Sequence, residues 1–186
     1  MTLQVALKEW AVVCRALAEG RQILLLRKGG IYESAGEFEI EHRKFLLLPT
    51  YLHQNKAMLK ERKHTDFQPA SAEPERINIS AFAEITDIIP MKSRAAMDAL
   101  DEQHVWTPPL IDMRFNYKPE NPLYLLLVRA NALRDPVMIE NTPAYAGCKS
   151  WVPLETAISV ADAKPVLDDA AYQMRRQKIL AVIQGL

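Results

Sequence analysis

Two short runs of this chain are apolar at every position, residues 23–26 and residues 123–128. A strand that faces water on one side alternates apolar and polar residues, whereas a strand without this alternation is covered on both faces. We therefore predict that both runs are interior strands of a sheet. This need for cover on two sides constrains the fold more than any other feature of the sequence.

Helical and strand-like patterns surround these two runs. Apolar residues at helical spacing predict an amphipathic helix over residues 4–19, with Gly20 as its C-terminal cap. Further helices are predicted over residues 50–63 and 93–103, and a helix of about twenty residues is predicted after Pro165. Strands are predicted over residues 37–42, 45–48, 77–80 and 82–88.

The order of these elements predicts the α+β class. We expect the N-terminal helix to pack on a mixed, curled β-sheet, followed by a second β-rich part and a long C-terminal helix. At 186 residues and 49% apolar content, the chain is expected to form a single domain, residues 1–186. The alternative is two lobes, residues 1–65 and 77–186, joined by a polar, proline-containing loop at residues 66–76.

Composition narrows the classes of function. The chain has 23 basic and 23 acidic residues, so we do not expect it to coat nucleic acid or an anionic membrane indiscriminately. No run approaches the ~18 uninterrupted apolar residues of a membrane span, and the first residues lack a secretory signal pattern. We expect a cytoplasmic protein without a membrane partner, in which Cys14 and Cys148 are reduced rather than joined.

Charged and polar residues concentrate just after the first apolar run. Arg27 and Lys28 precede a glycine pair at residues 29–30, where cations and turn amides together can bind a phosphate. A basic hairpin turn without a ligand is the structural alternative. The candidate ligand-binding residues are Arg27, Lys28, Glu33, Glu41, His42, His53 and Gln54. Four of them, Arg27, Lys28, Glu41 and His53, are predicted to line one polar pocket near the sheet.

Glu41 and His53 are also the candidate catalytic residues. Carboxylates and imidazoles are ligands of divalent metals, so a divalent metal cofactor is one option for this segment. However, the sequence contains no HExxH or CxxC motif, and adjacent strand residues such as Glu41 and His42 point to opposite faces. No metal ligands are therefore assigned. The acid and lysine spacing of a restriction-like nuclease is matched only poorly, by Glu33 and the segment at residues 41–44.

A basic segment lies between His42 and His64. It contains one acid, Glu61, against six cations, and it is either the solvated face of a helix or a local site for a polyanion. The cations are Arg43, Lys44, Lys56, Lys60, Arg62 and Lys63.

Several short motifs along nearly the whole chain resemble one bacterial family. They are residues 7–10, 26–31, Phe38 with 41–42, 49–50 with 53–54, and 145–152. Together they resemble the bacterial domain of unknown function 1802 family, which has no established activity. Some relatives carry a fused restriction-endonuclease-like domain, so the resemblance implies a restriction or DNA-defence context. Residues 10–27 are also similar to the opening of small β-barrel readers of modified nucleic acid.

Three classes of function stay open on this basis. The first is a nucleic-acid-associated accessory or sensor domain, with DNA or RNA as its partner. The second is a metal-dependent phosphodiesterase or nuclease-like enzyme. The third is a small-molecule or protein-interaction domain whose charged residues form only a structural network. Salt-dependent binding of nucleic acid separates the first class from the third, and metal-dependent turnover that requires Glu41 marks the second.

Overall fold

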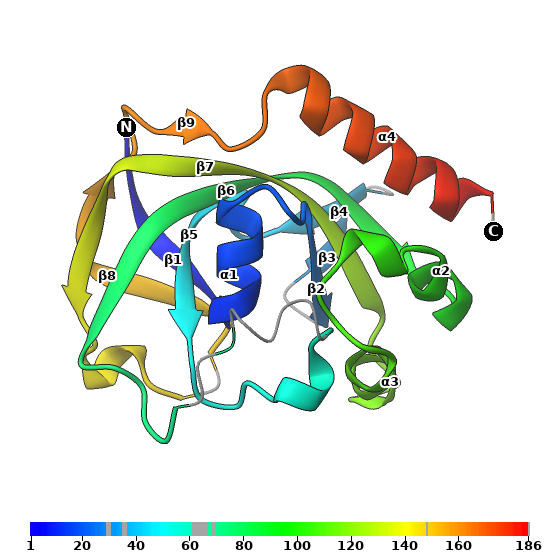
Figure 1. Cartoon of the computed structure of the whole chain (residues 1–186), viewed down its shortest axis with the longest axis horizontal. Coiled ribbons are helices and arrows are strands. Elements are labelled where there is room, and N and C mark those ends of the chain that lie inside the picture. Colours follow the sequence, from blue (N-terminus) through cyan, green and yellow to red (C-terminus); the bar gives the residue numbers. More distant parts are fainter. Residues whose placement is uncertain (29–30, 35–36, 61–66, 68–69, 148, 186) are drawn as a thin grey trace.

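The main element of the protein is a mixed, seven-stranded sheet in the order β2-β7-β6-β5-β1-β8, with β9 paired to β7 (Figure 1). The computed structural model describes residues 1–28, 31–34, 37–60, 67, 70–147 and 149–185, with the backbone alone for 31–34 and 37–39. β1 and β5 are parallel, and the other strand pairs are antiparallel. The strands of this sheet are β1 (Thr2–Trp10), β2 (Leu24–Lys28), β5 (Lys44–Thr50), β6 (Arg76–Met91), β7 (Leu123–Glu140), β8 (Trp151–Ser159) and β9 (Lys164–Pro165).

A small hairpin and several helices complete the fold. The hairpin consists of β3 (Ile31–Ser34) and β4 (Glu37–Ile40). The long strands β6 and β7 arch over α1, α4 lies on the outside of this arch, and α2 and α3 lie beside β2 (Figure 1). The α-helices are α1 (Ala11–Ala18), α2 (Arg94–Ala99), α3 (Pro108–Asn116) and α4 (Asp169–Gln184). Short 3-10 helices are η1 (Lys56–Met58), η3 (Asp101–Gln103) and η4 (Pro143–Tyr145).

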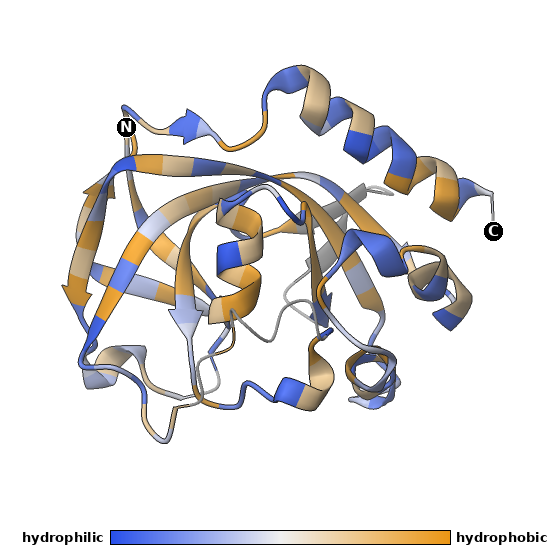
Figure 2. Cartoon of the chain, viewed as in Figure 1, coloured by the Kyte–Doolittle hydropathy of each residue, from blue (hydrophilic) through white to orange (hydrophobic). Residues whose placement is uncertain are grey.

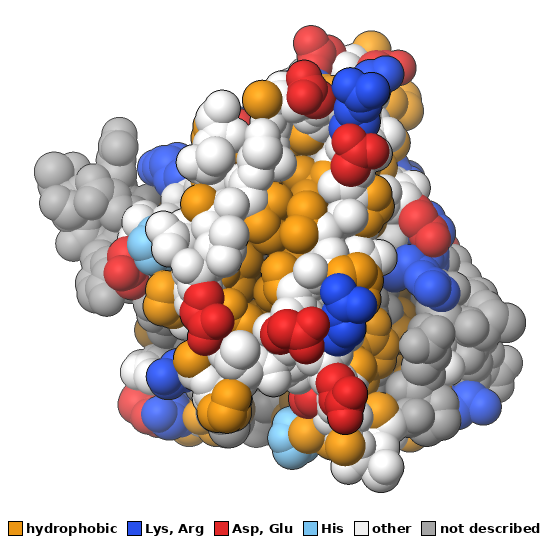
Figure 3. Space-filling view, turned by 90° about the vertical axis from the view of Figure 1, so that its left-hand side faces the viewer, with side chains coloured by type: hydrophobic (Ala, Val, Ile, Leu, Met, Phe, Trp, Pro, Cys, Tyr) orange, Lys and Arg blue, Asp and Glu red, His pale blue; other side chains and the backbone are white. Residues whose placement is uncertain are grey.

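The curled sheet separates two apolar clusters. Alternate residues of β5 show the division, because Phe45 and Leu47 pack with α1, whereas Leu46 and Leu48 pack with apolar residues of β8. Apolar residues are concentrated on α1 and on the strands that enclose it, while α4 carries many hydrophilic residues (Figure 2). The side of the molecule that carries β8 shows a band of apolar side chains with acidic and basic residues around it (Figure 3).

The predicted α+β class is confirmed, with the N-terminal helix on a mixed, curled sheet and a long C-terminal helix. Both apolar runs are buried as predicted. β7 is an interior strand, but β2 is the last strand in the sheet order, so the prediction of an interior position is wrong for residues 23–26. The sheet contains strands from both parts of the chain, since β2, β5 and β1 come from residues 1–65 and β6, β7 and β8 come from residues 76–159. The division into domains stays a prediction.

The helix predicted over residues 4–19 is wrong in its first half. Residues 2–10 form β1, which lies between β5 and β8, and helix α1 begins only at Ala11. Neighbouring residues Ala6 and Leu7 are both fully buried, one in each apolar cluster. Burial on both faces of a strand therefore outweighed an apolar spacing that also fits a helix.

The helix predicted over residues 50–63 is also wrong in the described part of that range. Thr50 is the last residue of β5 and pairs with Trp10, and only η1 is helical between residues 50 and 60. Leu59 is buried and forms a β-bridge with Trp106. Extended pairing of this segment thus replaced the helix, while residues 61–63 lie outside the described residues.

Other boundaries differ by a few residues. The strand predicted over 37–42 ends at Ile40, and the two strands predicted between residues 77 and 88 are one long strand, β6. The helix predicted over 93–103 is divided into α2 and η3. The C-terminal helix begins at Asp169, because the carboxylate of Asp168, its N-cap, accepts a hydrogen bond from the N–H of Ala171. Pro165 belongs to β9.

No helix in the described part of the chain has the length and apolarity that crossing a bilayer demands.

Candidate functional site

Arg27 points away from water although it is a cation. Its side chain is only 12% exposed, and one guanidinium nitrogen lies 3.7 Å from a carboxylate oxygen of Glu9, which is itself 5% exposed. β7, β6 and β5 separate the two strands that carry these residues, so the ion pair crosses the inside of the curled sheet. Burial lowers the pKa of Arg27, and the Glu9 carboxylate opposes this shift.

Glu9 is held firmly at the junction of β1 and α1. Its other carboxylate oxygen accepts a hydrogen bond from the N–H of Trp10 at 2.8 Å. Its backbone carbonyl accepts from the Thr50 hydroxyl at 3.2 Å and from the Cys14 thiol at 3.7 Å. Glu9 is not among the candidate residues predicted from the sequence, because a helix was predicted over residues 4–19 in place of the strand that buries it. A glutamate inside a strand with buried neighbours is the signal that could have identified it.

A second arginine approaches the same ion pair from α3. The charge of Arg114 also lowers the pKa of Arg27, after burial and against the effect of Glu9. The Arg114 Nε is buried and has no hydrogen-bond partner among the described residues. The group thus contains two guanidinium groups and one carboxylate, so it carries a net positive charge. We refer to Glu9, Arg27 and Arg114 as the arginine cluster.

Lys28 lies next to the arginine cluster but has a structural contact of its own. Its ammonium nitrogen donates a hydrogen bond of 2.7 Å to the backbone carbonyl of Phe115. This carbonyl is in the last turn of α3, where helix carbonyls lack intrahelical partners and cations are favourable. Lys28 therefore ties the end of β2 to the helix that carries Arg114.

Glu41 and His42 form a separate pair beyond the end of β4. Glu41 is 60% exposed, and its carboxylate lies 3.4 Å from the Nε2 of His42. The His42 ring packs edge-on against Trp151, with ring centroids 5.3 Å apart. The expectation that these two side chains point to opposite faces of one strand is wrong, because both follow the last residue of β4 and contact each other.

The remaining candidates lie on a turn and a hairpin. His53 is exposed and has a positive φ of 67°, and Gln54 hydrogen-bonds to the N–H of Val12 at 3.1 Å. The side chain of Glu33 and the glycine pair at residues 29–30 lie outside the described residues. No described contact joins Arg27 or Lys28 with Glu41 or His53, and their predicted common pocket stays a prediction.

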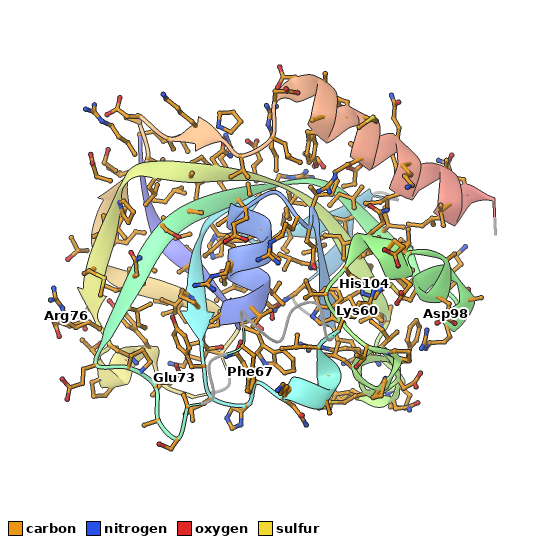
Figure 4. All side chains as sticks on the ribbon, viewed as in Figure 1. Lys60, Phe67, Glu73, Arg76, Asp98 and His104 are labelled. Atoms are coloured by element: carbon orange, nitrogen blue, oxygen red, sulfur yellow. The ribbon has the colours of Figure 1, made fainter. Side chains whose placement is uncertain are left out.

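Two cations of the basic segment form ion pairs within the fold. Lys44 lies 3.2 Å from Glu84 on the neighbouring strand, and Lys60 lies 2.9 Å from Asp101. Lys60 also donates to the carbonyl of His104 at 3.0 Å, and the two labelled side chains lie close together in Figure 4. Among the described residues, no three His, Cys, Asp or Glu side chains come together as metal ligands.

A family model described as "Domain of unknown function (DUF1802)" matches residues 6–178. None of the curated proteins matches the chain. Crystal structures of two mutant ZmASCH proteins from Zymomonas mobilis are similar to it at 9% sequence identity. One has a TM-score of 0.44 and covers 94% of each chain. The other has a TM-score of 0.46 and covers 93% of this chain and 96% of its own.

Proposed function

This chain belongs to the family described as a domain of unknown function (DUF1802), and on that premise we propose that it is a nucleic-acid-associated accessory or sensor domain. The arginine cluster is its proposed phosphate site. The restriction or DNA-defence context implied by the family resemblance is a further expectation, and the cluster bears only on phosphate binding.

The excess of positive charge in the arginine cluster is the observation that supports this proposal. Burial and then the charge of Arg114 lower the pKa of Arg27, while the Glu9 carboxylate supplies one negative charge against the two guanidinium groups. Removing a charge from water is costly unless an opposite charge or hydrogen bonds compensate it. An anion between the two guanidinium groups would supply both the missing charge and an acceptor for the Arg114 Nε.

Phosphate is the anion that suits this arrangement best. A guanidinium group presents several N–H donors in a planar fork that matches the oxygens of a phosphate. The chain as a whole has no net charge, so attraction to a polyanion must come from local groups such as this cluster. We therefore expect contacts with few phosphates and a shallow dependence of affinity on salt.

Replacement of Arg114 is the sharpest test. We expect Arg114→Gln to weaken binding of labelled single- or double-stranded DNA or RNA in fluorescence anisotropy titrations. The log–log slope of affinity against salt, measured between about 50 and 200 mM, is expected to become shallower by about one. Arg134→Gln is the matched control, because Arg134 is 73% exposed and its ion-pair partner, Asp135, lies 3.9 Å away.

Arg27 is a poorer choice for this experiment. Its removal would leave the Glu9 carboxylate buried without its partner, which costs about 3–5 kcal/mol in comparable buried pairs. A variant that unfolds would say nothing of binding. If wild-type protein binds no DNA or RNA at low salt, or if Arg114→Gln and Arg134→Gln behave alike, the arginine cluster is a structural network and the proposal fails.

A further inference from the structure

A pocket of about 260 Å³ lies between α1 and the strands β5 and β6. Its apolar wall includes Ala11 and Ala18 from the helix and Leu47 and Pro49 from β5. The short alanine side chains leave space between the helix and the sheet. The arginine cluster contributes no residue to this pocket, so it is a separate feature of the fold.

The sheet presents polar residues to this pocket. Asn78 and Ser80 of β6 line it, whereas the alternate residues Ile77 and Ile79 belong to the apolar cluster on the other side of the sheet. The register of β6 with β7 shifts between Ile79 and Ala81, so Ser80 lies at a bulge, a feature that changes where a side chain points. Within the described part of the chain, the side chains of Asn78 and Ser80 make no hydrogen bond. Their donors and acceptors are therefore free for a ligand.

Tyr51 supplies an aromatic ring at the same pocket, and its position is fixed from a distant loop. The Glu73 carboxylate accepts hydrogen bonds from the N–H of Tyr51 at 3.0 Å and from the N–H of Leu52 at 2.9 Å. Figure 4 shows Glu73 in the loop before β6. Burial, followed by the Cys14 thiol, raises the pKa of Tyr51. The phenol is therefore protonated at neutral pH and can donate.

The pocket residues together carry no net charge. Arg15 of α1 and Glu19, the C-cap residue of this helix, line the pocket with opposite charges, and the Glu19 carboxylate forms an ion pair with Arg21 at 2.5 Å. A ligand with a net charge would find no excess of counter-charge among the pocket residues, so an uncharged ligand is favoured. Tyr51, Asn78 and Ser80 can each donate and accept a hydrogen bond. The ligand should therefore carry both donors and acceptors on a partly apolar body.

We propose that this pocket binds an uncharged heteroaromatic ring with hydrogen-bonding groups on its edge, which is the chemistry of a nucleobase. Its volume lies just below the ~300–1,000 Å³ of sites for drug-sized ligands, as a single ring system requires. Such a ring can come from a free nucleoside or from a base in a nucleic acid strand. The inference goes beyond the proposed function, because it does not require the arginine cluster.

Titration with free nucleosides tests the pocket directly. We expect adenosine, guanosine, cytidine or uridine to cause saturable amide shifts in NMR spectra of the full chain. Asn78→Leu should weaken that binding about tenfold, since it removes a side chain that both donates and accepts. Asn116→Leu, an exposed residue at the end of α3, is the matched control. Ala18→Leu is a second variant, because it fills the pocket and leaves the polar groups in place.

A second arm uses a single-stranded oligonucleotide to separate the two sources of the ring. If nucleosides cause no shifts but Asn78→Leu weakens oligonucleotide binding while Asn116→Leu does not, the base comes from a strand and the inference holds. The inference fails if no nucleoside binds and Asn78→Leu leaves oligonucleotide affinity unchanged. In that case a loss of affinity in Arg114→Gln would still support the phosphate site, so the two proposals fail separately.

Discussion

The side-chain carbonyl of Gln54 accepts a hydrogen bond of 3.1 Å from the backbone N–H of Val12, 42 residues earlier in the chain. Val12 is in the first turn of α1, where N–H groups lack partners within the helix. Trp10, at the N-cap, supplies no side-chain acceptor. Gln54 therefore caps α1 from another segment of the chain. It accepts the hydrogen bond that the side chain of a Ser or Asp at the N-cap position usually accepts.

Loss of this cap is expected to destabilise the protein. Gln54→Leu should lower the free energy of unfolding by about 0.5–2 kcal/mol, the range for lost N-caps, in urea denaturation. Gln177→Leu, at an exposed position of α4, is the control for the gain of a leucine. Equal losses in the two variants would contradict a capping role for Gln54.

The docking of α4 depends on Arg176 and Asp87. Two guanidinium nitrogens donate to the two carboxylate oxygens of Asp87 at 2.7 and 2.5 Å, and Tyr172 of the same helix lies 2.6 Å from the Thr86 hydroxyl. We expect Asp87→Asn to cost about 1.5–3 kcal/mol, as for hydrogen bonds to charged groups. Hydrogen exchange should then show faster opening of α4. Arg134→Gln serves as an exposed-arginine control, and unchanged exchange in Asp87→Asn would disprove the role of this ion pair.

The Arg176–Asp87 ion pair is also expected to make the stability of the protein depend on pH in the acid range. Burial opposes ionisation of Asp87, but hydrogen bonds from Arg176 and Thr86 outweigh it and hold its pKa below the ordinary value. Since the folded pKa is below the unfolded one, the stabilisation is full above the ordinary pKa of about 3.9 and is lost as the pH falls below it. Urea midpoints between pH 5 and 2 should fall less steeply in Asp87→Asn than in the wild-type protein.

Protonation of His104 is expected to cause a second loss of stability, at a higher pH than the loss that Asp87 causes. The residue is 4% exposed, and burial, followed by the charge of Lys60, lowers its pKa to about 4. Because the unfolded histidine titrates near pH ~6.5, the unfolded chain gains the proton first as pH falls. Stability should therefore decline between about pH 6.5 and 4, by about 3 kcal/mol in total.

Urea denaturation across this pH range checks the role of His104. We expect His104→Gln to flatten the decline, since it removes the titrating imidazole. His53→Asn is the control, because His53 is exposed and asparagine tolerates its positive φ. If the decline between pH 6.5 and 4 is the same in His104→Gln as in the wild-type protein, another group causes it.

Leu25 tests the burial of β2. Its side chain is fully buried in the apolar cluster around α1, and its backbone lies opposite Leu126 of β7. Leu25→Ala is expected to lower the free energy of unfolding by roughly 2–5 kcal/mol, the range for large-to-small changes in a core. Met174→Ala, at an exposed position of α4, should change it by less than about 0.5 kcal/mol. A loss below about 1 kcal/mol in Leu25→Ala would contradict the packing.

Cys14 is expected to be an unreactive thiol in the folded protein. It is free and buried, and burial, followed by the Glu9 carboxylate, raises its pKa. In a Cys148→Ser background, Ellman's reagent should react with Cys14 only when the protein unfolds, and dithiothreitol should leave the Tm unchanged. Fast reaction of the native variant would contradict the burial of Cys14. Cys148 itself lies outside the described residues.

Much of the fold follows from local composition. Leu24, Leu25 and Leu26 allow no solvated face, so their burial follows from the sequence alone. The same reasoning identified β7, the strand at residues 45–48 that lies in β5, and the C-terminal helix. It failed for residues 4–10, because their apolar spacing fits a helix as well as a strand covered on both faces.

The site depended on tertiary structure to a greater degree. The sequence singled out Arg27 as a cation after a buried strand, but its partner Glu9 lies on a strand that is not its neighbour in the sheet. Gln54 likewise caps a helix whose first turn is 42 residues away in the chain. The orientation of Asn78 toward the pocket beside α1 depends on strand pairing and on a β-bulge. Apolar periodicity is a property of neighbouring residues and can be read from the chain. The partner of a charge or of an amide is set by the curl of the sheet, which brings distant residues together and which no local pattern encodes.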